Sequence, residues 1–356
     1  MAMITNNFVR RKAALVQLGS SMKSLIDHED WPGYEIGVEE EIFSAFHQSI
    51  KLSSVKNPWF TSQMINHALT VWAQQLREEN INQWLNKYND LDKLSSKTVL
   101  IICAGNLPLV GWHDFICCYL LGAKVQLKLS KSDDVLIPEL IKILTLFDAD
   151  VENNIQVLEQ KPMNYDLVIA TGSNNTNRYF DYYFGKYPHI FRKNRTSIAV
   201  IDDHTSTNDL EKLANDVFGY FGLGCRSVTK LYIKKGFEID KIFNAFFAYK
   251  EIMNHVKYMN NYDYNKSIYL LEEIPFLDNG FVMLKEDVQL HSPVSVLNYE
   301  YYEHLEELNE KLTIIDNEIQ CRVGLNGIPF GSAQNPSLSD YADGIDTIQF
   351  LIDNLN

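Results

Sequence analysis

The sequence predicts an α/β protein built on doubly wound parallel sheets, with a helical N-terminal region ahead of them. Two patterns support this prediction. Ahead of residue 98 the apolar residues recur at helical spacing, and from residue 98 onwards apolar, β-branched runs alternate with helical segments. Because ligands of doubly wound sheets bind outside the carboxyl ends of the strands, the turns after the apolar runs are where we look for function.

Helices are predicted in the N-terminal region from two stripes of apolar residues. The first stripe lies in residues 37–53 and consists of Ile42, Phe43, Phe46 and Ile50. The second lies in residues 61–88, follows a cap at Thr61 or Ser62, and consists of Met64, Ile65, Leu69, Trp72 and Leu76. Such stripes face a core far more often than they line a cofactor site, so we expect packed helices.

Strands and helices alternate in the rest of the pattern. Residues 98–105 (TVLIICAG) form a continuous aliphatic run, as expected for a strand that is covered on both faces. Further strands are expected at 123–130, 165–173, 195–202 and 227–234, and helices at 106–122 and 135–148. Cys117 and Cys118 fall on the apolar helix and are expected in the core.

Composition narrows the function classes. The chain has 356 residues, 46% of them hydrophobic, and a formal net charge of -14, which argues against non-specific binding to nucleic acid or to an anionic membrane. Its five cysteines include no CxxC pair, so we expect neither a disulfide framework nor a zinc site. The N-terminal stretch is too polar for a secretory signal, and no window approaches the roughly 18 apolar residues of a membrane span. We therefore expect a cytoplasmic protein that acts on small molecules.

Cys225 is the first candidate for chemistry. It follows Gly222-Leu223-Gly224, where the backbone can turn sharply, and it precedes Arg226 at the start of a predicted strand. A permanent cation nearby favours the nucleophilic thiolate. The alternative is a small buried residue without a chemical role.

Further candidates follow the predicted strands. Asn106 can donate its amide to an oxyanion or cap the following helix. Thr171, Gly172 and Ser173 offer hydroxyl and amide groups suited to phosphate, although such turns are common. At the end of the predicted strand at 123–130, the cations of Lys128 and Lys131 and the hydroxyl of Ser130 can bind a ribose or a phosphate. The alternative is a solvated loop. Both GxGxxG and the P-loop pattern are absent.

Other reactive residues have simpler explanations. Asp202, Asp203 and His204 are candidate metal ligands, but Asn208 with Glu211 predicts a helix cap just after them, so we expect no metal site. His113 is expected to be structural, with a place near a cofactor cleft as the alternative. The aromatic residues of 243–264 are expected to pack in the core, with the lining of an acyl channel as the alternative.

The order of these motifs identifies a family resemblance. An Asn-x-Pro turn, a Lys-x-Ser strand end, a Thr-Gly-Ser turn and a Gly-x-Gly-Cys turn follow one another, and together they resemble the aldehyde dehydrogenase superfamily. More narrowly, the chain resembles the LuxC-type fatty acyl-CoA reductases of bacterial luminescence. That resemblance extends from about residue 55 to the C-terminus, and its motifs are 57–61 (NPWFT), 105–133, 218–232, 292–302 and 329–351.

The resemblance implies an aldehyde dehydrogenase-like fold with a cofactor-binding and a catalytic lobe. It implies that Cys225 is the nucleophile and that Asn106 and the backbone N–H of Cys225 stabilise the oxyanion. Lys128 would bind the adenosine ribose of a nicotinamide cofactor, and Gly172 with Ser173 would approach its pyrophosphate. The implied domains are a helical region plus cofactor-binding domain (1–195), a catalytic domain (196–330) and a closing segment (331–356).

Two departures from the family pattern refine the expectation. Phe191 stands where the superfamily's hydrolytic glutamate is expected, and nothing from Tyr182 to Ile201 is acidic. Without a base to activate water, an acyl-cysteine favours reduction over hydrolysis. Gln289 replaces the glutamate that holds the nicotinamide ribose. Lys131 replaces an acid common in NAD-preferring relatives, which favours NADPH, with NADH as the alternative.

The expected function is NADPH-dependent reduction of a fatty acyl-CoA, or of an acyl-carrier thioester, to an aldehyde through an acyl-cysteine on Cys225. The resemblance suggests an acyl-transferring synthetase partner, and we expect a homo-oligomer. Three alternatives stay open: an oxidative aldehyde or semialdehyde dehydrogenase, a catalytically silent nucleotide-binding protein, and an acyltransferase that consumes no cofactor.

Overall fold

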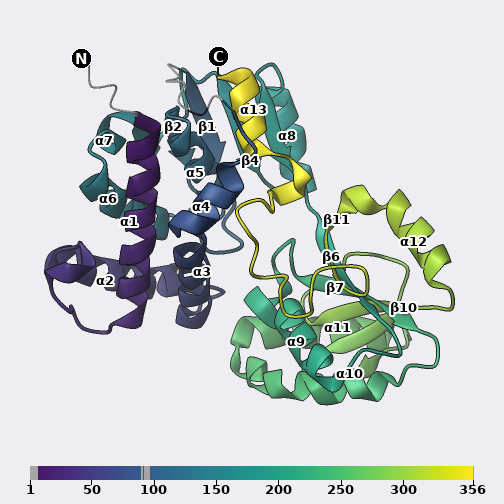
Figure 1. The fold of residues 1–356 in the computed structure, drawn as a ribbon. Helices are drawn as coiled ribbons and strands as arrows, with labels where there is room; N and C mark the ends of the chain where they lie inside the picture. Colours follow the sequence, from purple (N-terminus) through teal and green to yellow (C-terminus); the bar gives the residue numbers. More distant parts are fainter. Residues whose placement is uncertain (1–6, 90, 92–96, 356) are drawn as a thin grey trace, which may run out of the picture. The chain divides into compact units, whose positions relative to one another are not determined.

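The structure is a computed structural model that describes residues 7–89, 91 and 97–355. Residues 1–6 of the N-terminal stretch considered above therefore lie outside the described part. The chain divides into two compact units. Unit 1 combines residues 1–193 with 337–356, and unit 2 consists of residues 194–336. Figure 1 shows the C-terminal segment, in yellow, returning to unit 1.

Unit 1 begins with helices, which confirms the prediction for the N-terminal region. They are α1 (Asn7–Asp27), the 3-10 helix η1 (Tyr34–Ile36), α2 (Glu40–Lys56), α3 (Ser62–Gln75) and α4 (Glu78–Leu85). Thr61 caps α3, since its hydroxyl accepts a hydrogen bond from the backbone N–H of Met64 at 3.3 Å. The second apolar stripe is interrupted, because α3 ends before Leu76 and α4 begins at Glu78.

A five-stranded parallel sheet forms the centre of unit 1, in the order β3-β2-β1-β4-β5. Its strands are β1 (Thr98–Ile102), β2 (Lys124–Lys128), β3 (Ile155–Val157), β4 (Leu167–Thr171) and β5 (His189–Arg192). The accompanying helices are α5 (Trp112–Leu120), α6 (Leu136–Phe147), α7 (Val151–Asn154), α8 (Asn174–Phe184), η5 (Ala342–Gly344) and α13 (Thr347–Asn354). The doubly wound parallel sheet is therefore confirmed.

Helix α5 lies in the core of unit 1. Cys117 and Cys118 are fully buried, as predicted. His113 packs against the rings of Trp72 and Trp84 and stacks on Tyr341, with ring centroids 5.2 Å apart. Burial lowers the pKa of His113 to about 4, so the ring is neutral near pH 7. His113 therefore packs among aromatic rings in the core of unit 1, where its Nε2 has no hydrogen-bond partner within the described residues.

Unit 2 is built on a six-stranded sheet in the order β11-β6-β7-β10-β9-β8, parallel except for the β8–β9 pair. Its strands are β6 (Thr196–Ile201), β7 (Val228–Lys234), β8 (Leu277–Asp278), β9 (Met283–Glu286), β10 (Val296–Tyr302) and β11 (Ile319–Gly324). Its helices are α9 (Thr207–Phe218), η2 (Gly219–Gly222), α10 (Ile239–Phe246), η3 (Phe247–Asn254), α11 (Val256–Leu271), α12 (Leu305–Ile314) and η4 (Asp316–Glu318). Phe246, Tyr258 and Tyr262 are buried, so core packing explains these aromatic residues of 243–264.

The predicted cap of α9 at Asn208 is wrong. Ser206 is the N-cap, and it forms a capping box with Asp209. The reason lies just upstream, where the Asp202 carboxylate accepts hydrogen bonds from the N–H of His204 and the hydroxyl of Thr205. This turn brings Ser206 into an extended conformation, and the helix begins at the next residue.

None of the helices within the described residues combines the length and the apolar character needed to cross a bilayer. In the same part of the chain, no cluster of three or more His, Cys, Asp or Glu side chains is arranged to hold a metal ion.

Candidate functional site

The carboxyl edge of the unit 1 sheet gathers three of the predicted turns. Ile102 at the end of β1 is in register with Lys128 on one side and with Ala170 on the other. The residues that follow the three strands therefore leave the sheet at one edge. The strand order reverses between β2 and β4 around β1, which is where doubly wound sheets bind their ligands.

The turn that carries Asn106 is packed closely against the turn after β2. A side chain on Gly105 would overlap the hydroxyl of Ser130, so only glycine fits there. The buried side chain of Asn57 joins the two turns, since its amide donates to the carbonyl of Gly105 at 3.3 Å and to that of Ser132 at 3.5 Å. The Asn106 side chain itself is exposed.

Asp133 holds the other end of the Asn106 turn. Its carboxylate accepts the N–H of Leu109 at 2.8 Å, and Leu109 has a left-handed backbone with φ of 63°. Asp133 is 4% exposed, and burial raises its pKa from 3.8 to about 7. A buried carboxyl group thus fixes the turn that presents Asn106.

Lys128 already has partners in this structure. Its ammonium group donates to the carbonyls of Leu158, Glu159 and Gln160, at 3.4, 2.9 and 3.4 Å. These carbonyls belong to the loop after β3, so Lys128 ties that loop to the end of β2. Lys131 is exposed, and Ser130 is half-buried.

The Thr171–Ser173 turn forms the start of α8. The Ser173 hydroxyl caps the helix by accepting the N–H of Thr176 at 3.3 Å. A side chain on Gly172 would collide with Phe180 and Thr176. Both residues therefore have structural roles, and the same turn presents the amide groups of a helix N-terminus at the sheet edge.

Phe191 occupies β5 with an aromatic environment around it. Its ring stacks on His189, with centroids 4.0 Å apart, and lies 5.8 Å from the ring of Phe180. The next residue, Arg192, is buried and donates to Asp114 and Thr347. The position at which the resemblance expects a hydrolytic base is therefore filled by an apolar ring on an anchored strand.

In unit 2, Cys225 follows a strained turn. Tyr220, Phe221 and Gly222 have φ values of 53°, 58° and 74°, so three consecutive residues are left-handed. Two of them are bulky aromatic residues, for which this conformation costs on the order of 1–2 kcal/mol each. Backbone strain of this kind clusters at functional sites. Cys225 is half-buried and forms no disulfide.

Two buried serines fix the turn around Cys225. The Ser197 hydroxyl donates to the carbonyl of Cys225 at 3.0 Å. The Ser227 hydroxyl accepts the N–H of Gly224 at 3.3 Å and donates to the carbonyl of Gly219 at 3.5 Å. The guanidinium group of Arg226 donates to the carbonyl of Ala333.

The other thiols differ in their surroundings. Cys103, Cys117 and Cys118 are buried, and burial raises the pKa of each well above its usual value. Cys321 is half-buried, and its sulfur lies 3.0 Å from the Ser197 hydroxyl. Cys225 and Cys321 are therefore the two cysteines with partial exposure.

Gln289 lies in unit 2 on the segment between β9 and β10, and its side chain is exposed. A small pocket in this unit is lined by Phe221 and Gly222 of η2, by Thr229 and Tyr258, and by the turn 292–296. The turns that precede Cys225 and follow Gln289 thus border one pocket, although neither residue lines it.

Several residues that hold these turns carry no signal of that role in the sequence: Asn57, Asp133, Ser197 and Ser227, and also Lys230 and Asn298, which bond the carbonyls of Asp287, Gln289 and His291. Asn57 belongs to the NPWFT motif, which was noted only as a family signal. Lys230 interrupts the apolar pattern of a predicted strand, and a lysine at such a position indicates a buried polar side chain that needs partners.

The fold of this chain matches the folds of solved aldehyde dehydrogenases. It aligns with aldehyde dehydrogenase 21 from Physcomitrella patens, solved with the reaction product succinate, at a TM-score of 0.62 and 14% identity, over 98% of this chain and 84% of that one. It aligns with indole-3-acetaldehyde dehydrogenase from P. syringae, solved with NAD+ and IAA, at 0.59 and 12%, over 89% and 71%. For KauB from Pseudomonas aeruginosa the values are 0.60 and 12%, over 90% and 73%. The fold is therefore aldehyde dehydrogenase-like, as predicted.

A family model described as acyl-CoA reductase (LuxC) matches residues 62–248, just over half of the chain. The chain therefore belongs to the LuxC acyl-CoA reductase family, and it is an oxidoreductase of the acyl- or aldehyde-reducing type. A comparison with curated protein sequences finds no significant match.

Proposed function

We propose that this protein reduces an acyl-CoA thioester to an aldehyde, with NADPH as the reductant and an acyl-cysteine on Cys225 as the intermediate. Cys225 carries the proposal. It is a half-buried thiol that follows three left-handed residues, and its turn is fixed by buried hydroxyl groups. The three fully buried thiols lack both features.

The first step is attack of the Cys225 thiolate on the thioester carbonyl. A carbon–sulfur bond forms to the protein, and the bond to CoA breaks as its thiolate leaves. We propose that Asn106 donates its amide to the oxyanion, because Asn57 and Asp133 hold its turn while its side chain stays exposed. Because the amide of Asn106 would already be in place, no free energy would be spent on reorganising it when the oxyanion forms.

Phe191 supports reduction over hydrolysis. The acyl-cysteine survives only if water is not activated beside it, and a stacked aromatic ring offers neither a base nor a hydrogen bond to water. The same argument disfavours the oxidative dehydrogenase, which needs to hydrolyse its acyl intermediate at every turnover.

The carboxyl edge of the unit 1 sheet fits a nicotinamide nucleotide. The turns after β1 and β2 pack closely against each other at Gly105 and Ser130, and a helix N-terminus follows β4 at the point where the strand order reverses. Lys131 would face the 2′-phosphate of NADPH, and Thr171, Gly172 and Ser173 would face the pyrophosphate. Lys128 would reach the ribose only by sharing donors that now bind three carbonyls. Gln289 would hold the nicotinamide ribose.

The nucleotide, when bound, supplies the hydride that the acyl carbon needs. The protein then stabilises the oxyanion of the resulting thiohemiacetal, which collapses to release the aldehyde and the Cys225 thiolate. One thioester, one reduced nucleotide and one proton give one aldehyde, one free CoA and one oxidised nucleotide.

The decisive experiment is an acyl-CoA chain-length series with NADH and NADPH in parallel, in which aldehyde and free CoA are both quantified. We expect equal amounts of aldehyde and CoA, with NADPH preferred and long chains reduced fastest. Radioactive acyl-CoA should label the wild type but not Cys225→Ala, and Cys321→Ala is the matched control. CoA release without cofactor consumption indicates an acyltransferase, and nucleotide binding without labelling indicates a silent binding protein.

A further inference from the structure

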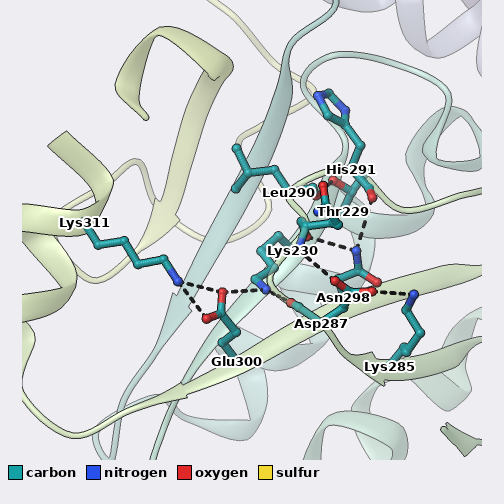
Figure 2. A network of polar contacts seen from close by, with 10 residues as sticks. Thr229, Lys230, Lys285, Asp287, Leu290, His291, Asn298, Glu300 and Lys311 are labelled. Carbon is teal, nitrogen blue, oxygen red and sulfur yellow. Dashed lines mark hydrogen bonds and ion pairs between the residues drawn. The ribbon is translucent and has the colours of Figure 1, made fainter. Parts of the chain in front are cut away.

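The segment that carries Gln289 is held by side chains of two neighbouring strands. Thr229 of β7 donates to the carbonyl of Leu290 at 2.8 Å. Asn298 of β10 donates to the carbonyls of Gln289 and His291, at 3.0 and 3.2 Å. Figure 2 shows these side chains converging on one side of the segment. Side chains of the sheet therefore hold three successive carbonyls of a connecting segment, those of Gln289, Leu290 and His291.

Lys230 adds a costly member to this network. Its ammonium group donates to the carbonyl of Asp287 and lies 2.8 Å from the Glu300 carboxylate (Figure 2). The side chain is fully buried, and burial lowers the pKa of Lys230. An apolar residue in a central strand would avoid the cost of removing an ammonium ion from water. A contribution to the stability of the fold therefore does not by itself explain why a lysine stands at this position.

The backbone of Gln289 is fixed at both ends while its side chain is exposed. Its N–H donates to the Asp287 carboxylate at 2.9 Å, and its carbonyl accepts from Asn298. Asp287 is in turn held by Lys285 through its carboxylate and by Lys230 through its carbonyl. The side chain of Gln289 is thus exposed on a backbone whose N–H and carbonyl are both hydrogen-bonded to side chains.

We infer that Lys230, Asn298 and Thr229 are positioning residues that hold Gln289 ready for the ribose hydroxyls of the nicotinamide nucleotide. The inference rests on the proposed function, because that function assigns Gln289 to the cofactor. Ordering a mobile loop on binding costs affinity, and a loop ordered beforehand avoids that cost. The network therefore acts on cofactor affinity, and it leaves the acylation of Cys225 unaffected.

The chain offers a matched pair of variants. Lys230 and Lys311 both bind Glu300, Lys311 at 2.7 and 2.9 Å, but only Lys230 contacts the Gln289 segment. We expect Lys230→Met to raise the Kd and the KM for NADPH by about tenfold, the scale at which a misplaced group is felt. Lys311→Met should stay within about twofold. Binding is measured by quenching of intrinsic fluorescence, and acylation by the burst of CoA released without nucleotide, which both variants should retain.

A double variant tests whether Lys230 acts through Gln289. In the Gln289→Ala background, Lys230→Met should change the Kd for NADPH by less than about twofold, because the side chain being positioned is gone. Thr229→Val gives the same test if Lys230→Met does not fold, since it removes the bond to Leu290 and, outside this segment, only a hydroxyl bond to Thr196. An equal Kd for Lys230→Met and Lys311→Met, with normal acylation, overturns the inference and leaves the proposed function standing. Failure of the wild type to bind either nucleotide overturns both.

Discussion

Arg192 and Asp114 form a buried ion pair, with 2.6 Å between the guanidinium nitrogen and the carboxylate oxygen and less than a tenth of either side chain exposed. Thr347 of α13 completes the group, since its hydroxyl accepts from Arg192 and donates to Asp114 at 3.1 Å. Together the three residues join β5, α5 and α13, and they fix the strand on which Phe191 lies.

Arg192→Met should destabilise unit 1 by about 3–5 kcal/mol, because it leaves the Asp114 carboxylate buried without its cation. Urea denaturation followed by circular dichroism measures the change. The double variant Arg192→Met/Asp114→Leu should recover part of the loss, since neither charge then remains. A loss below about 1 kcal/mol for the single variant contradicts the buried pair.

Phe191→Glu should convert part of the reductase activity into thioester hydrolysis. The new carboxylate can activate water beside the acyl-cysteine, so free acid and CoA should form without nucleotide at a rate about 10²-fold or more above the wild type. Phe191→Gln is the matched control, because glutamine is close to glutamate in size but has no carboxylate that could act as a base. Equal hydrolysis by the two variants argues that this position does not face the intermediate.

Asp133 should make the wild type less stable as the pH rises. Its pKa is raised from 3.8 to about 7 in the folded state, so folding takes up a proton between these values and stability falls across pH 4 to 7. Asp133→Asn removes this dependence and still accepts the bond from Leu109. Relative to the wild type, the variant should gain roughly 2.5 kcal/mol between pH 5 and pH 8, measured by urea titration. Burial also raises the pKa of Asp216, to about 6, but this residue is present in both proteins, so its contribution cancels in the difference between them. A pH-independent difference contradicts the prediction.

Ser206→Ala should cost about 1 kcal/mol, since it removes the N-cap of α9. Asn208→Ala, the neighbouring site that the sequence pattern favours, should change stability by less than about 0.5 kcal/mol. Thermal or urea denaturation of the two single variants decides between the caps, and the reverse order of the two effects would contradict the capping box.

Alkylation of the folded protein should separate the cysteines. Iodoacetamide at pH 8 should modify Cys225 and Cys321, which are half-buried, well before the three core thiols. Burial raises the pKa of Cys117 and Cys118, and both should react only after unfolding. Peptide mapping by mass spectrometry gives the order, and early modification of Cys117 speaks against its place in the core.

The longer elements could be predicted because their patterns are unambiguous. The run at 98–105 contains β1, and the first stripe lies within α2, while all of the second stripe except Leu76 lies within α3. Strands β3 and β8 span three and two residues, too few for any periodicity to emerge. The cap of α9 was misplaced because Ser206-x-x-Asp209 and Asn208-x-x-Glu211 both fit the pattern, and only the upstream turn of Asp202 selects the first.

The candidate site could be predicted only in part. The strand-end turns were found because chain order places them at one edge of a parallel sheet. The residues that fix those turns lie far along the chain from them, as Asn57 does from Ser132 and Ser197 from Cys225. Contacts between distant positions leave no spacing signal in a single sequence, so Asn57 and Ser197 emerged only from the structure.

The division of unit 1 into two stretches of chain has a consequence for biosynthesis. Residues 337–356 complete this unit, and they supply Thr347 to Arg192, Tyr341 to the indole of Trp84 and a backbone carbonyl to Lys97. The ribosome makes them only after unit 2 has been translated. Until then Arg192, Trp84 and Lys97 lack the partners that residues 337–356 supply, and unit 2 can fold first. During that interval the nascent chain is exposed to chaperones and proteases, and slowing of translation within unit 2 would prolong it.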